Sequence, residues 1–212
     1  MLLILVKKYI MNIMNNLISK RKPIIIFTGP SGVGKGTIEK YLFDFKNLKL
    51  HLSCSATTRA PREGEINGIH YFFITKEEFE KHIQNDDLFE YSFHFDNYYG
   101  TLYSEIARIH RNGEIPVLEI ETNGAKQILE KVSNNKNYKL ITLFILPPSI
   151  EELERRIINR KTESQEAIKK RLAKAQAEIA EKGIFRHHII NDDPLRAAKE
   201  IKEIIEKEYG IK

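Results

Sequence analysis

The sequence predicts an α/β protein whose core is a doubly wound parallel sheet with helices on both faces. Short apolar runs rich in β-branched residues recur at residues 23–28, 48–53, 115–120, 140–146 and 188–190. Most are separated by stretches with helical spacing, an alternation typical of a parallel sheet that is buried on both faces. Residues 54–103 interrupt the alternation with turn-rich and antiparallel-style segments. We therefore expect an inserted ligand-binding subdomain there.

Length and composition indicate one folded domain of ordinary size. The chain has 212 residues, of which 42% are hydrophobic and 30% charged, a balance that argues against disorder. Thirty-four Lys and Arg against 29 Asp and Glu give a net charge of +5, which fits an anionic ligand without defining it. The single cysteine, Cys54, excludes an internal disulfide and a cysteine-rich zinc site. No apolar run approaches the roughly 20 residues that a membrane-spanning helix needs.

The first 21 residues are expected to lie outside the folded domain, which then spans residues 22–212. Their apolar residues precede their lysines, the reverse of a secretory signal, and no small-residue cleavage site follows. Met11 and Met14 are alternative start sites. We interpret this segment as a disordered tail or a start-site artefact, and a short amphipathic anchor is the alternative.

Local patterns predict the other elements up to residue 103. We expect a helix at 37–45, a strand at 71–74, a helix at 75–84, and a strand at 88–95 followed by a turn at 96–97. The helix at 75–84 opens with a capping box, in which Thr75 and Glu78 exchange hydrogen bonds with the amides of the first turn. The alternating strand and its turn predict a hairpin.

Helix signals dominate the second half of the chain. They predict helices at 102–111, 124–132, 149–160, 166–181 and 194–208. Ser149 and Glu152 form a second capping box, and Asp193 precedes a proline at the first position of the last helix.

A glycine-rich segment joins the first predicted strand to the first predicted helix. It reads GPSGVGKGT and consists of Gly29, Pro30, Ser31, Gly32, Val33, Gly34, Lys35, Gly36 and Thr37. In this context the glycines turn successive amides inward and, with the helix N-terminus, form a phosphate-binding P-loop. Lys35 then faces the β- and γ-phosphates of a nucleotide. The alternative is a glycine turn without a ligand. The residue after Lys35 is Gly36, where most P-loops have Ser or Thr. The resulting GKGT ending resembles that of adenylate kinases. Direct ligation of Mg²⁺ by a P-loop hydroxyl is therefore in doubt.

Several further motifs follow the P-loop in a fixed order. They are SCSATTRAPREGEINGIHY (53–71), FEY (89–91), NYYGT (97–101), LEIETNGA (118–125), LPPS (146–149), RRIINRKTES (155–164), KKRL (169–172) and INDD (190–193). Together they resemble the guanylate kinase family of P-loop nucleoside monophosphate kinases, from about residue 23 to the C-terminal helix. The resemblance implies a core (22–53, 104–146 and 176–212), a GMP-binding insertion (54–103) and a helical lid (147–175).

Two arginines and two tyrosines are the candidate site for the acceptor phosphate. Arg59 and Arg62 lie three residues apart in a turn-rich loop, and guanidinium groups bind a phosphomonoester bidentately. A surface role is the alternative for either arginine alone. The resemblance adds Tyr71 and Tyr99 as hydroxyl donors to the same phosphate.

The resemblance assigns the choice of base to Glu90. Guanine presents N1–H and an exocyclic amine as adjacent donors, and one carboxylate accepts from both, so a wrong base leaves a buried acceptor unmatched. By resemblance Ser55 and Thr101 are the hydroxyl partners of Glu90. An exposed strand residue is the alternative interpretation.

Glu119 and Glu121 end a predicted strand, where the carboxyl ends of parallel strands face a ligand crevice. We expect Glu121 to contact guanine or organise the acceptor, and Glu119 to organise Mg²⁺ through water, with Thr37 as a further candidate. A structural ion pair with Lys35 or an arginine is the alternative.

Three arginines of the second half are assigned to the lid and to the helix that returns from it. Arg156 and Arg160 share one helix face, and Arg171 follows on the next helix. Mobile arginines stabilise the charge that spreads over a phosphoryl group during transfer. By resemblance Asn191 touches the adenine of ATP, with a structural turn as the alternative. The expected catalytic residues are Lys35, Arg59, Arg156, Arg160 and Arg171.

The resemblance implies transfer of the γ-phosphoryl group of ATP to GMP, with Mg²⁺, without a covalent intermediate, and supplying GDP to purine nucleotide metabolism. We expect a cytoplasmic enzyme with no nucleic-acid or membrane partner, and the sequence leaves the use of dGMP and the oligomeric state open. Two rivals are a non-catalytic module that holds phosphopeptides in the acceptor site and a P-loop kinase of another phosphorylated metabolite.

Overall fold

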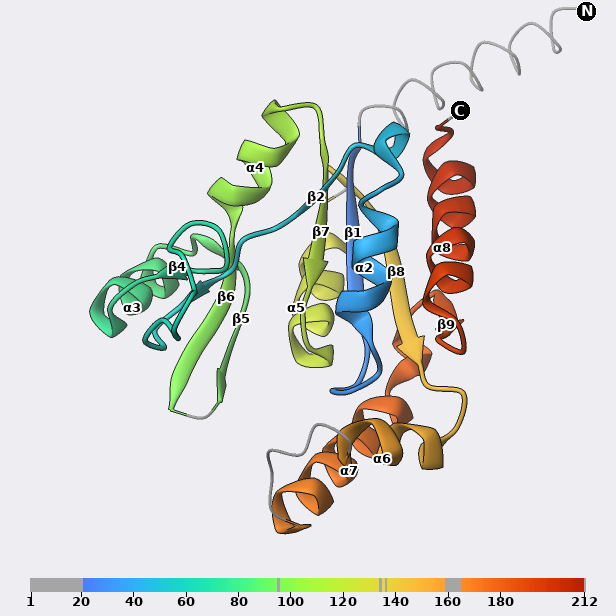
Figure 1. Cartoon of the computed structure of the whole chain (residues 1–212). Coiled ribbons are helices and arrows are strands. Elements are labelled where there is room, and N and C mark those ends of the chain that lie inside the picture. Colours follow the sequence, from blue (N-terminus) through green and yellow to red (C-terminus); the bar gives the residue numbers. More distant parts are fainter. Residues whose placement is uncertain (1–20, 95, 134, 136, 159–164, 212) are drawn as a thin grey trace, which may run out of the picture.

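The core of the molecule is a five-stranded parallel sheet with the strand order β2-β7-β1-β8-β9 (Figure 1). The computed structural model describes residues 21–94, 96–133, 135, 137–158 and 165–211. The core strands are β1 (Lys22–Thr28), β2 (Leu50–Leu52), β7 (Ile115–Glu119), β8 (Tyr138–Leu146) and β9 (His187–Ile190). All pairings among them are parallel, which confirms the predicted α/β class and its doubly wound sheet.

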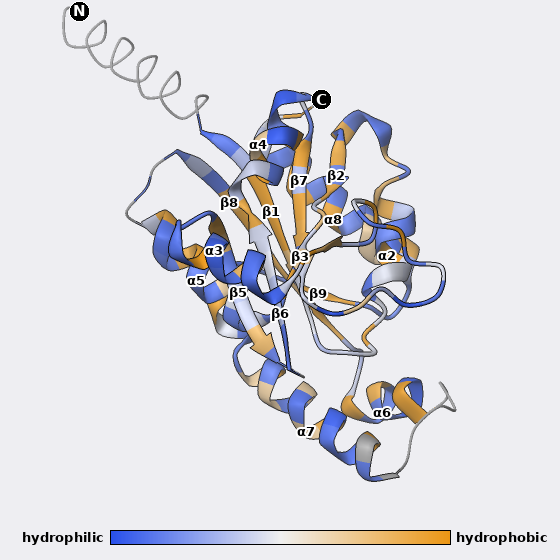
Figure 2. Cartoon of the chain, turned by 90° about the vertical axis from the view of Figure 1, so that its left-hand side faces the viewer, coloured by the Kyte–Doolittle hydropathy of each residue, from blue (hydrophilic) through white to orange (hydrophobic). Residues whose placement is uncertain are grey.

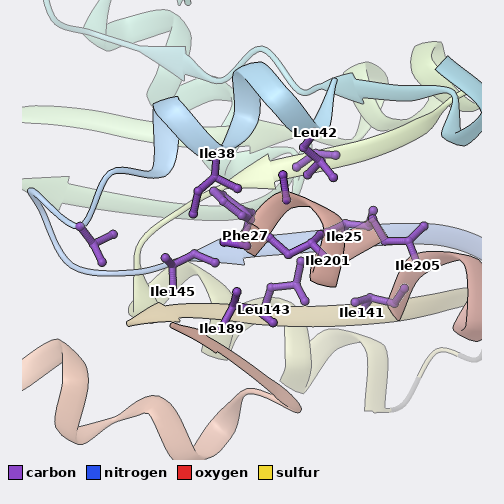
Figure 3. Packing of buried hydrophobic residues seen from close by; sticks show 14 of the residues in the cluster. Ile25, Phe27, Ile38, Leu42, Ile141, Leu143, Ile145, Ile189, Ile201 and Ile205 are labelled. Carbon is purple, nitrogen blue, oxygen red and sulfur yellow. The ribbon is translucent and has the colours of Figure 1, made fainter. Parts of the chain in front are cut away.

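Helices cover both faces of this sheet because its central strand is apolar on both sides (Figure 2). Ile25 and Phe27 of β1 pack against α2 (Lys35–Leu42) and α8 (Pro194–Tyr209), as Figure 3 shows. The alternate residues of β1, Ile24 and Ile26, pack toward α4 (Tyr103–Arg111) and α5 (Thr122–Ser133). A strand that is buried on both faces shows a continuous apolar run, and that run made β1 predictable.

A second, mixed sheet interrupts the core between β2 and α4. Its order is β4-β3-β6-β5, and its strands are β3 (Ala56–Thr57), β4 (Phe72–Phe73), β5 (Leu88–His94) and β6 (Asn97–Leu102). The predicted hairpin is the antiparallel pair β5–β6, with Asp96 at its turn in the left-handed region at φ 59°. Helix α3 (Lys76–Gln84) packs on the sheet through the fully buried Phe79. The sequence analysis missed β3, because two residues in a turn-rich loop carry no periodicity.

Beyond β8 the chain forms α6 (Ile150–Ile158) and α7 (Gln165–Ala180), which lie below the sheet in the view of Figure 1. Leu153 and Ile157 of α6 pack into the same apolar cluster as Val33 of the glycine-rich loop. Residues 159–164, and with them Arg160, lie outside the described residues. Short 3-10 turns, η1 (Lys46–Leu48) and η2 (Lys182–Ile184), precede β2 and β9.

Helix ends follow the predicted capping signals in two of three cases. The box of Thr75 and Glu78 is complete, and Asp193 caps α8 by accepting from the amide of Arg196. At α6 the hydroxyl of Ser149 accepts from the amide of Glu152, but the Glu152 carboxylate binds Arg155 and Arg156 instead of closing the box.

The element boundaries differ from those predicted by a few residues. Helix α2 begins at Lys35, two residues early, and β2 is shorter than its apolar run because the 3-10 turn η1 occupies the beginning of that run. The expectation for residues 1–21 falls almost entirely outside the described residues. Within the part that the structure describes, no helix has both the length and the apolar content needed to cross a bilayer.

Candidate active site

The glycine-rich loop leaves the central strand at its carboxyl end and wraps the start of α2. Gly32 and Gly34 adopt φ values of 86° and 95°, which side chains with a Cβ rarely adopt. A Cβ at Gly29 would lie 2.7 Å from the backbone oxygen of Ile145, so the loop also passes close to β8. The loop borders a cavity of about 450 Å³ lined by Ser31, Gly32, Gly34, Lys35, Gly36, Thr37, Lys40 and Glu119. Backbone amides at a helix N-terminus make this cavity suited to phosphate.

Lys35 stands at the first position of α2 with two oxygen partners. Its Nζ donates to the Gly29 carbonyl at 2.7 Å and lies 3.6 Å from Glu119 Oε1. Glu119 is in place because β1 and β7 pair in parallel, with Phe27 opposite Glu119. The sheet register thus brings a carboxylate to the mouth of the loop, and it forms the ion pair with Lys35 that we predicted as the alternative role of Glu119.

Arg156 and Asn191 hold the outer side of the loop. Arg156 donates to the carbonyls of Val33 and Asn191, both at 3.1 Å, and Asn191 Nδ2 donates to the same Val33 carbonyl at 2.7 Å. Asn191 is 2% exposed, and its Oδ1 has no hydrogen-bond partner among the described residues. Both side chains therefore fix the loop, and neither is among the described residues that line the P-loop cavity.

A second cavity of about 360 Å³ lies between the carboxyl ends of the core strands and the smaller sheet. Its lining comprises Ser55, Arg59, Arg62, Glu65, Tyr71, Glu90, Ser92, His94, Tyr99, Gly100, Glu119, Ile120 and Glu121. Seven of the eight residues predicted for the acceptor are among them, and the eighth, Thr101, lies behind Glu90. Glu119 lines both cavities, so one residue marks where the two meet.

One end of this second cavity is cationic. Arg59 Nη2 donates to Glu65 Oε1 at 2.9 Å, and its guanidinium lies 5.5 Å from the ring centre of Tyr71. Glu65 also accepts from the amide of Arg62 at 2.7 Å. The hydrogen bond from Arg59 lowers the pKa of Glu65 to about 2, so the carboxylate stays charged. Glu65 therefore holds the arginine loop in shape. We did not predict a role for Glu65, although it ends the segment PREGE (61–65) of the motif at 53–71.

Two tyrosines complete this end. Tyr71 and Tyr99 meet edge to face, with ring centres 6.1 Å apart, and the His94 ring stacks on Tyr99 at 4.5 Å. Burial raises the pKa of Tyr71, which keeps its hydroxyl neutral and able to donate. Two guanidinium groups and two phenols thus surround space for a phosphate group.

The other end presents a buried carboxyl group. Glu90 is 4% exposed, and Thr101, opposite it on β6, donates to Glu90 Oε1 at 2.7 Å. Burial raises the pKa of Glu90 to about 7. In its ionised form, a carboxylate with one hydroxyl donor retains acceptor capacity for a ligand that brings donors of its own.

Gly124 makes room for this carboxyl group. It lies in the first turn of α5, and a Cβ there would come within 2.4 Å of Glu90 Oε2. Any side chain would displace the carboxylate. Gly124 belongs to the LEIETNGA motif, but the sequence does not reveal that this glycine faces Glu90, 34 positions earlier.

Helix α7 reaches the site through Lys174, which the sequence analysis missed. Lys174 Nζ donates to Glu121 Oε1 at 2.8 Å and also lies 3.8 Å from Glu178. Arg171 lies one turn earlier on α7 and is half-buried. The helix that returns from the predicted lid is therefore tied to the strand end that faces the second cavity.

A further carboxyl group lies against Glu119. Burial of Glu39 of α2, together with the negative charge of the neighbouring Glu119, raises the pKa of Glu39 to about 7. Its Oε1 is buried without a hydrogen-bond partner among the described residues. No group of three or more His, Cys, Asp or Glu side chains suited to a metal occurs in the described part of the chain.

Comparison with known proteins agrees with this geometry. The family model described as guanylate kinase matches residues 20–208. The guanylate kinase of Mycoplasmopsis synoviae (strain 53) is 57% identical over 194 residues, which cover 91% of this chain and 98% of the relative. That of Mycoplasmopsis pulmonis (strain UAB CTIP) is 58% identical over 187 residues, covering 88% and 95%.

A solved structure gives the same result for the fold. The crystal structure of guanylate kinase from Anaplasma phagocytophilum superposes with a TM-score of 0.69 at 29% identity, covering 90% of this chain and 87% of that one. The chain belongs to the guanylate kinase family.

Proposed function

We propose that this protein transfers the γ-phosphoryl group of ATP to GMP, giving ADP and GDP, with ATP on the glycine-rich loop and GMP in the second cavity. One observation carries the proposal: a cavity with guanidinium groups at one end and the buried Glu90 at the other shares Glu119 with the P-loop cavity. The guanidinium groups match the phosphate of a bound nucleotide, and Glu90 matches its base. The shared Glu119 places that phosphate next to the phosphates of the second nucleotide.

At the donor site the loop amides and Lys35 bind the phosphates of ATP. Lys35 is held by the Gly29 carbonyl and Glu119 in the structure, and the phosphates supply stronger oxygen partners. As negative charge moves toward the leaving group during transfer, the ammonium group and the amides stabilise it in place. Asn191, which donates to the Val33 carbonyl of the loop and whose buried Oδ1 has no hydrogen-bond partner among the described residues, is assigned to the adenine of ATP.

At the acceptor site Arg59, Arg62, Tyr71 and Tyr99 bind the phosphate of GMP. Arg59 exchanges its Glu65 partner for a phosphate oxygen, since a phosphomonoester carries close to two negative charges at neutral pH. The phenol groups donate to the remaining oxygens. The attacking oxygen is thereby directed toward Glu119 and the P-loop.

Guanine is read by the carboxylate of Glu90. Its oxygens accept from N1–H and the exocyclic amine, while Thr101 fixes the carboxylate and Ser55 adds a hydroxyl. We assign Glu121 to the same base. To contact guanine, its carboxylate must give up the hydrogen bond that Lys174 donates. Adenine lacks this pair of adjacent donors and would leave the buried acceptor unmatched.

Transfer needs no covalent enzyme intermediate, because both substrates lie in adjoining cavities and react directly. We assign transition-state stabilisation to Arg59, Arg156, Arg160 and Arg171, with closure of the lid (147–175) over the core (22–53, 104–146 and 176–212) and the insertion (54–103). Closure excludes the water that would otherwise hydrolyse ATP.

The residues around Lys35 fit a divalent cation. Thr37 lines the P-loop cavity, Glu119 contributes a carboxylate there, and the buried oxygen of Glu39 has no partner in the described chain. Oxygen ligands of this kind suit Mg²⁺. When bound, Mg²⁺ neutralises part of the charge on the β- and γ-phosphates.

A coupled assay of ADP release with GMP, dGMP, AMP, CMP and UMP tests the proposal. We expect turnover with GMP and little with AMP, CMP or UMP. Similar rates with AMP and GMP would contradict the reading of guanine by Glu90, and turnover of none of them would contradict the activity itself. The dGMP arm decides whether the 2′-hydroxyl matters, and a cytoplasmic location, where both substrates occur, stays a prediction.

A further inference from the structure

Two short connections join the smaller sheet to the core, because that sheet is inserted between β2 and α4. In the first connection the amide of Ser53 donates to the carbonyl of Val117 in the core sheet at 2.9 Å. The carbonyl of Ser55 accepts from the amide of Phe72 in the smaller sheet, also at 2.9 Å. Cys54 is therefore the residue at which the chain passes from one sheet to the other.

The second connection leads from β6 into α4 and carries a buried carboxylate. The amide of Tyr103 still donates to the Asp87 carbonyl, just before β5, at 3.0 Å, whereas Ile106 belongs to an apolar cluster of the core. Glu105 lies between Tyr103 and Ile106 and is 3% exposed. Its Oε1 accepts from the amide of Cys54 at 3.2 Å. One side chain therefore links the two connections, although Cys54 and Glu105 are 51 positions apart in the sequence.

Groups of the core hold this carboxylate in one orientation. Arg108 donates to both oxygens of Glu105, from Nε at 2.7 Å and from Nη2 at 2.9 Å. Arg108 Nη2 also lies 3.0 Å from Nε2 of His51 on β2, and His51 Nδ1 lies 3.0 Å from a carboxylate oxygen of Glu114. A two-point contact with a guanidinium group fixes the plane of a carboxylate as well as its place. Glu105 therefore gives the Cys54 amide an acceptor that the core keeps in position.

The acceptor cavity is lined from both sides of this junction. Ser55 follows Cys54 directly, and Tyr99 lies on β6, which leads to the second connection. Glu119 and Glu121 line the same cavity from the core, at the end of β7 and just beyond it. A rotation of the smaller sheet at the junction would change the distances between these two groups of residues. Because a displacement of about 1 Å can weaken a site strongly, the junction has to be fixed.

We propose that Glu105 is a positioning residue for the acceptor site: by holding the Cys54 amide, it sets the place of Ser55 and of the strand that follows relative to the end of β7. The proposal rests on the proposed function, because that function takes the occupant of the cavity to be GMP. Glu105 is not among the described residues that line either cavity, so its influence on a ligand passes through the junction. The P-loop cavity is lined by residues of the core, so its ligand should not be affected.

The effect should be moderate, because a second contact also restrains the smaller sheet. Gln127 of α5 donates to the backbone carbonyl of Tyr91 on β5 at 2.7 Å and accepts from the amide of Tyr91 at 3.1 Å. Loss of the contact between Glu105 and Cys54 therefore loosens the junction and leaves β5 docked on α5.

Isothermal titration calorimetry of GMP and of ADP, each added alone to the wild type and to Glu105→Gln, tests the proposal. Glutamine has one terminal oxygen and one NH₂ group, so it cannot accept from the Cys54 amide and from both donors of Arg108. We expect the dissociation constant of GMP to rise about fivefold to tenfold and that of ADP to stay within about twofold. In steady-state kinetics the KM for GMP should rise by a similar factor, while kcat at saturating GMP stays within about twofold.

Hydrogen exchange measured by mass spectrometry gives a readout at the junction itself. The amides of residues 53–59 should exchange faster in Glu105→Gln than in the wild type, and saturating GMP should reduce the difference. Glu208→Gln is the matched control, since the Glu208 side chain lies on α8, is 15% exposed and pairs with Arg186 at 3.0 Å. It should leave both dissociation constants and the exchange of residues 53–59 unchanged.

Circular dichroism checks that Glu105→Gln folds. If it does not, Arg108→Lys takes its place, since lysine keeps the charge but loses the two-point contact, and we expect a smaller rise in the dissociation constant of GMP. The proposal is overturned if the substitution leaves GMP binding unchanged, weakens GMP and ADP equally, or leaves the exchange of residues 53–59 as in the wild type. If the wild type binds ADP but not GMP, the proposed function fails instead.

Discussion

The two substrate sites are constructed in different ways. The P-loop cavity is lined mainly by one segment, residues 31–37, joined by Lys40 and Glu119, and we expect most contacts with a phosphate there to come from backbone amides. The acceptor site is made of side chains from several segments between residues 55 and 121, brought together by the smaller sheet and the end of β7. We expect the backbone cradle to recognise phosphate in general and the side-chain site to recognise one base. The two sites should therefore respond differently to substitution.

The largest effect is expected at the donor site. Lys35→Ala should lower kcat about 10³-fold or more with every acceptor, because the lost ammonium group stabilises charge that develops in the transition state. The KM for GMP should change little. Steady-state kinetics with GMP checks this, and Lys170→Ala, which removes an exposed lysine paired with Glu166, is the control. A Lys35→Ala enzyme that keeps a tenth of the wild-type kcat would contradict the assignment.

A smaller and selective effect is expected at the acceptor site. Glu90→Gln should lower kcat/KM for GMP about 10²-fold, because an amide cannot accept from both guanine donors and its own NH₂ opposes one of them. The KM for ATP should stay within about twofold. Steady-state kinetics with each substrate varied in turn measures both values. If the variant used GMP as efficiently as the wild type does, the assignment of guanine recognition to Glu90 would be wrong.

Gly124→Ala tests whether the space behind Glu90 matters. The added Cβ would lie 2.4 Å from Glu90 Oε2, so the carboxylate must shift and the KM for GMP should rise roughly tenfold. Gly183→Ala is the matched control, since a Cβ there meets nothing within 4 Å. An unchanged KM for GMP in Gly124→Ala would show that the carboxylate relaxes without cost.

The pH dependence of GMP binding sharpens the same point. Burial raises the pKa of Glu90 to about 7, and guanine needs the ionised form as its acceptor. Below pH 7 a growing fraction of Glu90 carries a proton, so the KM for GMP should rise by nearly tenfold per pH unit, and above pH 8 it should level off. GMP has its own phosphate titration near pH 6. The KM of Glu90→Gln for GMP, measured between pH 6 and pH 8.5, isolates the contribution of the phosphate titration. If the wild type and the variant showed the same dependence of KM on pH, the prediction would be wrong.

The core strands and the position of the glycine-rich loop could be predicted from the sequence because their information is local. An apolar run that is buried on both faces identifies β1, and the order of glycines and lysine identifies the loop. The groups that support the acceptor residues were missed. Gly124 matters because of Glu90, and Lys174 because of Glu121, and both relations exist only after the chain has folded.

Two residues that we predicted to contact substrates, Arg156 and Asn191, instead contact the glycine-rich loop. Arg156 donates to the Val33 carbonyl on the outer side of the loop, and Asn191 donates to the same atom. A sequence motif can assign these residues to a site, but it does not say which contacts their side chains make in the fold. Arg160 lies outside the described residues, so its role in transfer stays a prediction.

The ion pair between Arg59 and Glu65 gives the proposed acceptor site an internal competitor for incoming anions. Chloride and other singly charged anions of the medium would gain little by displacing a carboxylate that is already well placed. A doubly charged phosphate ester would gain more, because it would engage Arg59, Arg62 and the phenols together. We therefore expect the site to stay selective in an ionic environment, with Glu65 setting the affinity that an incoming anion must exceed.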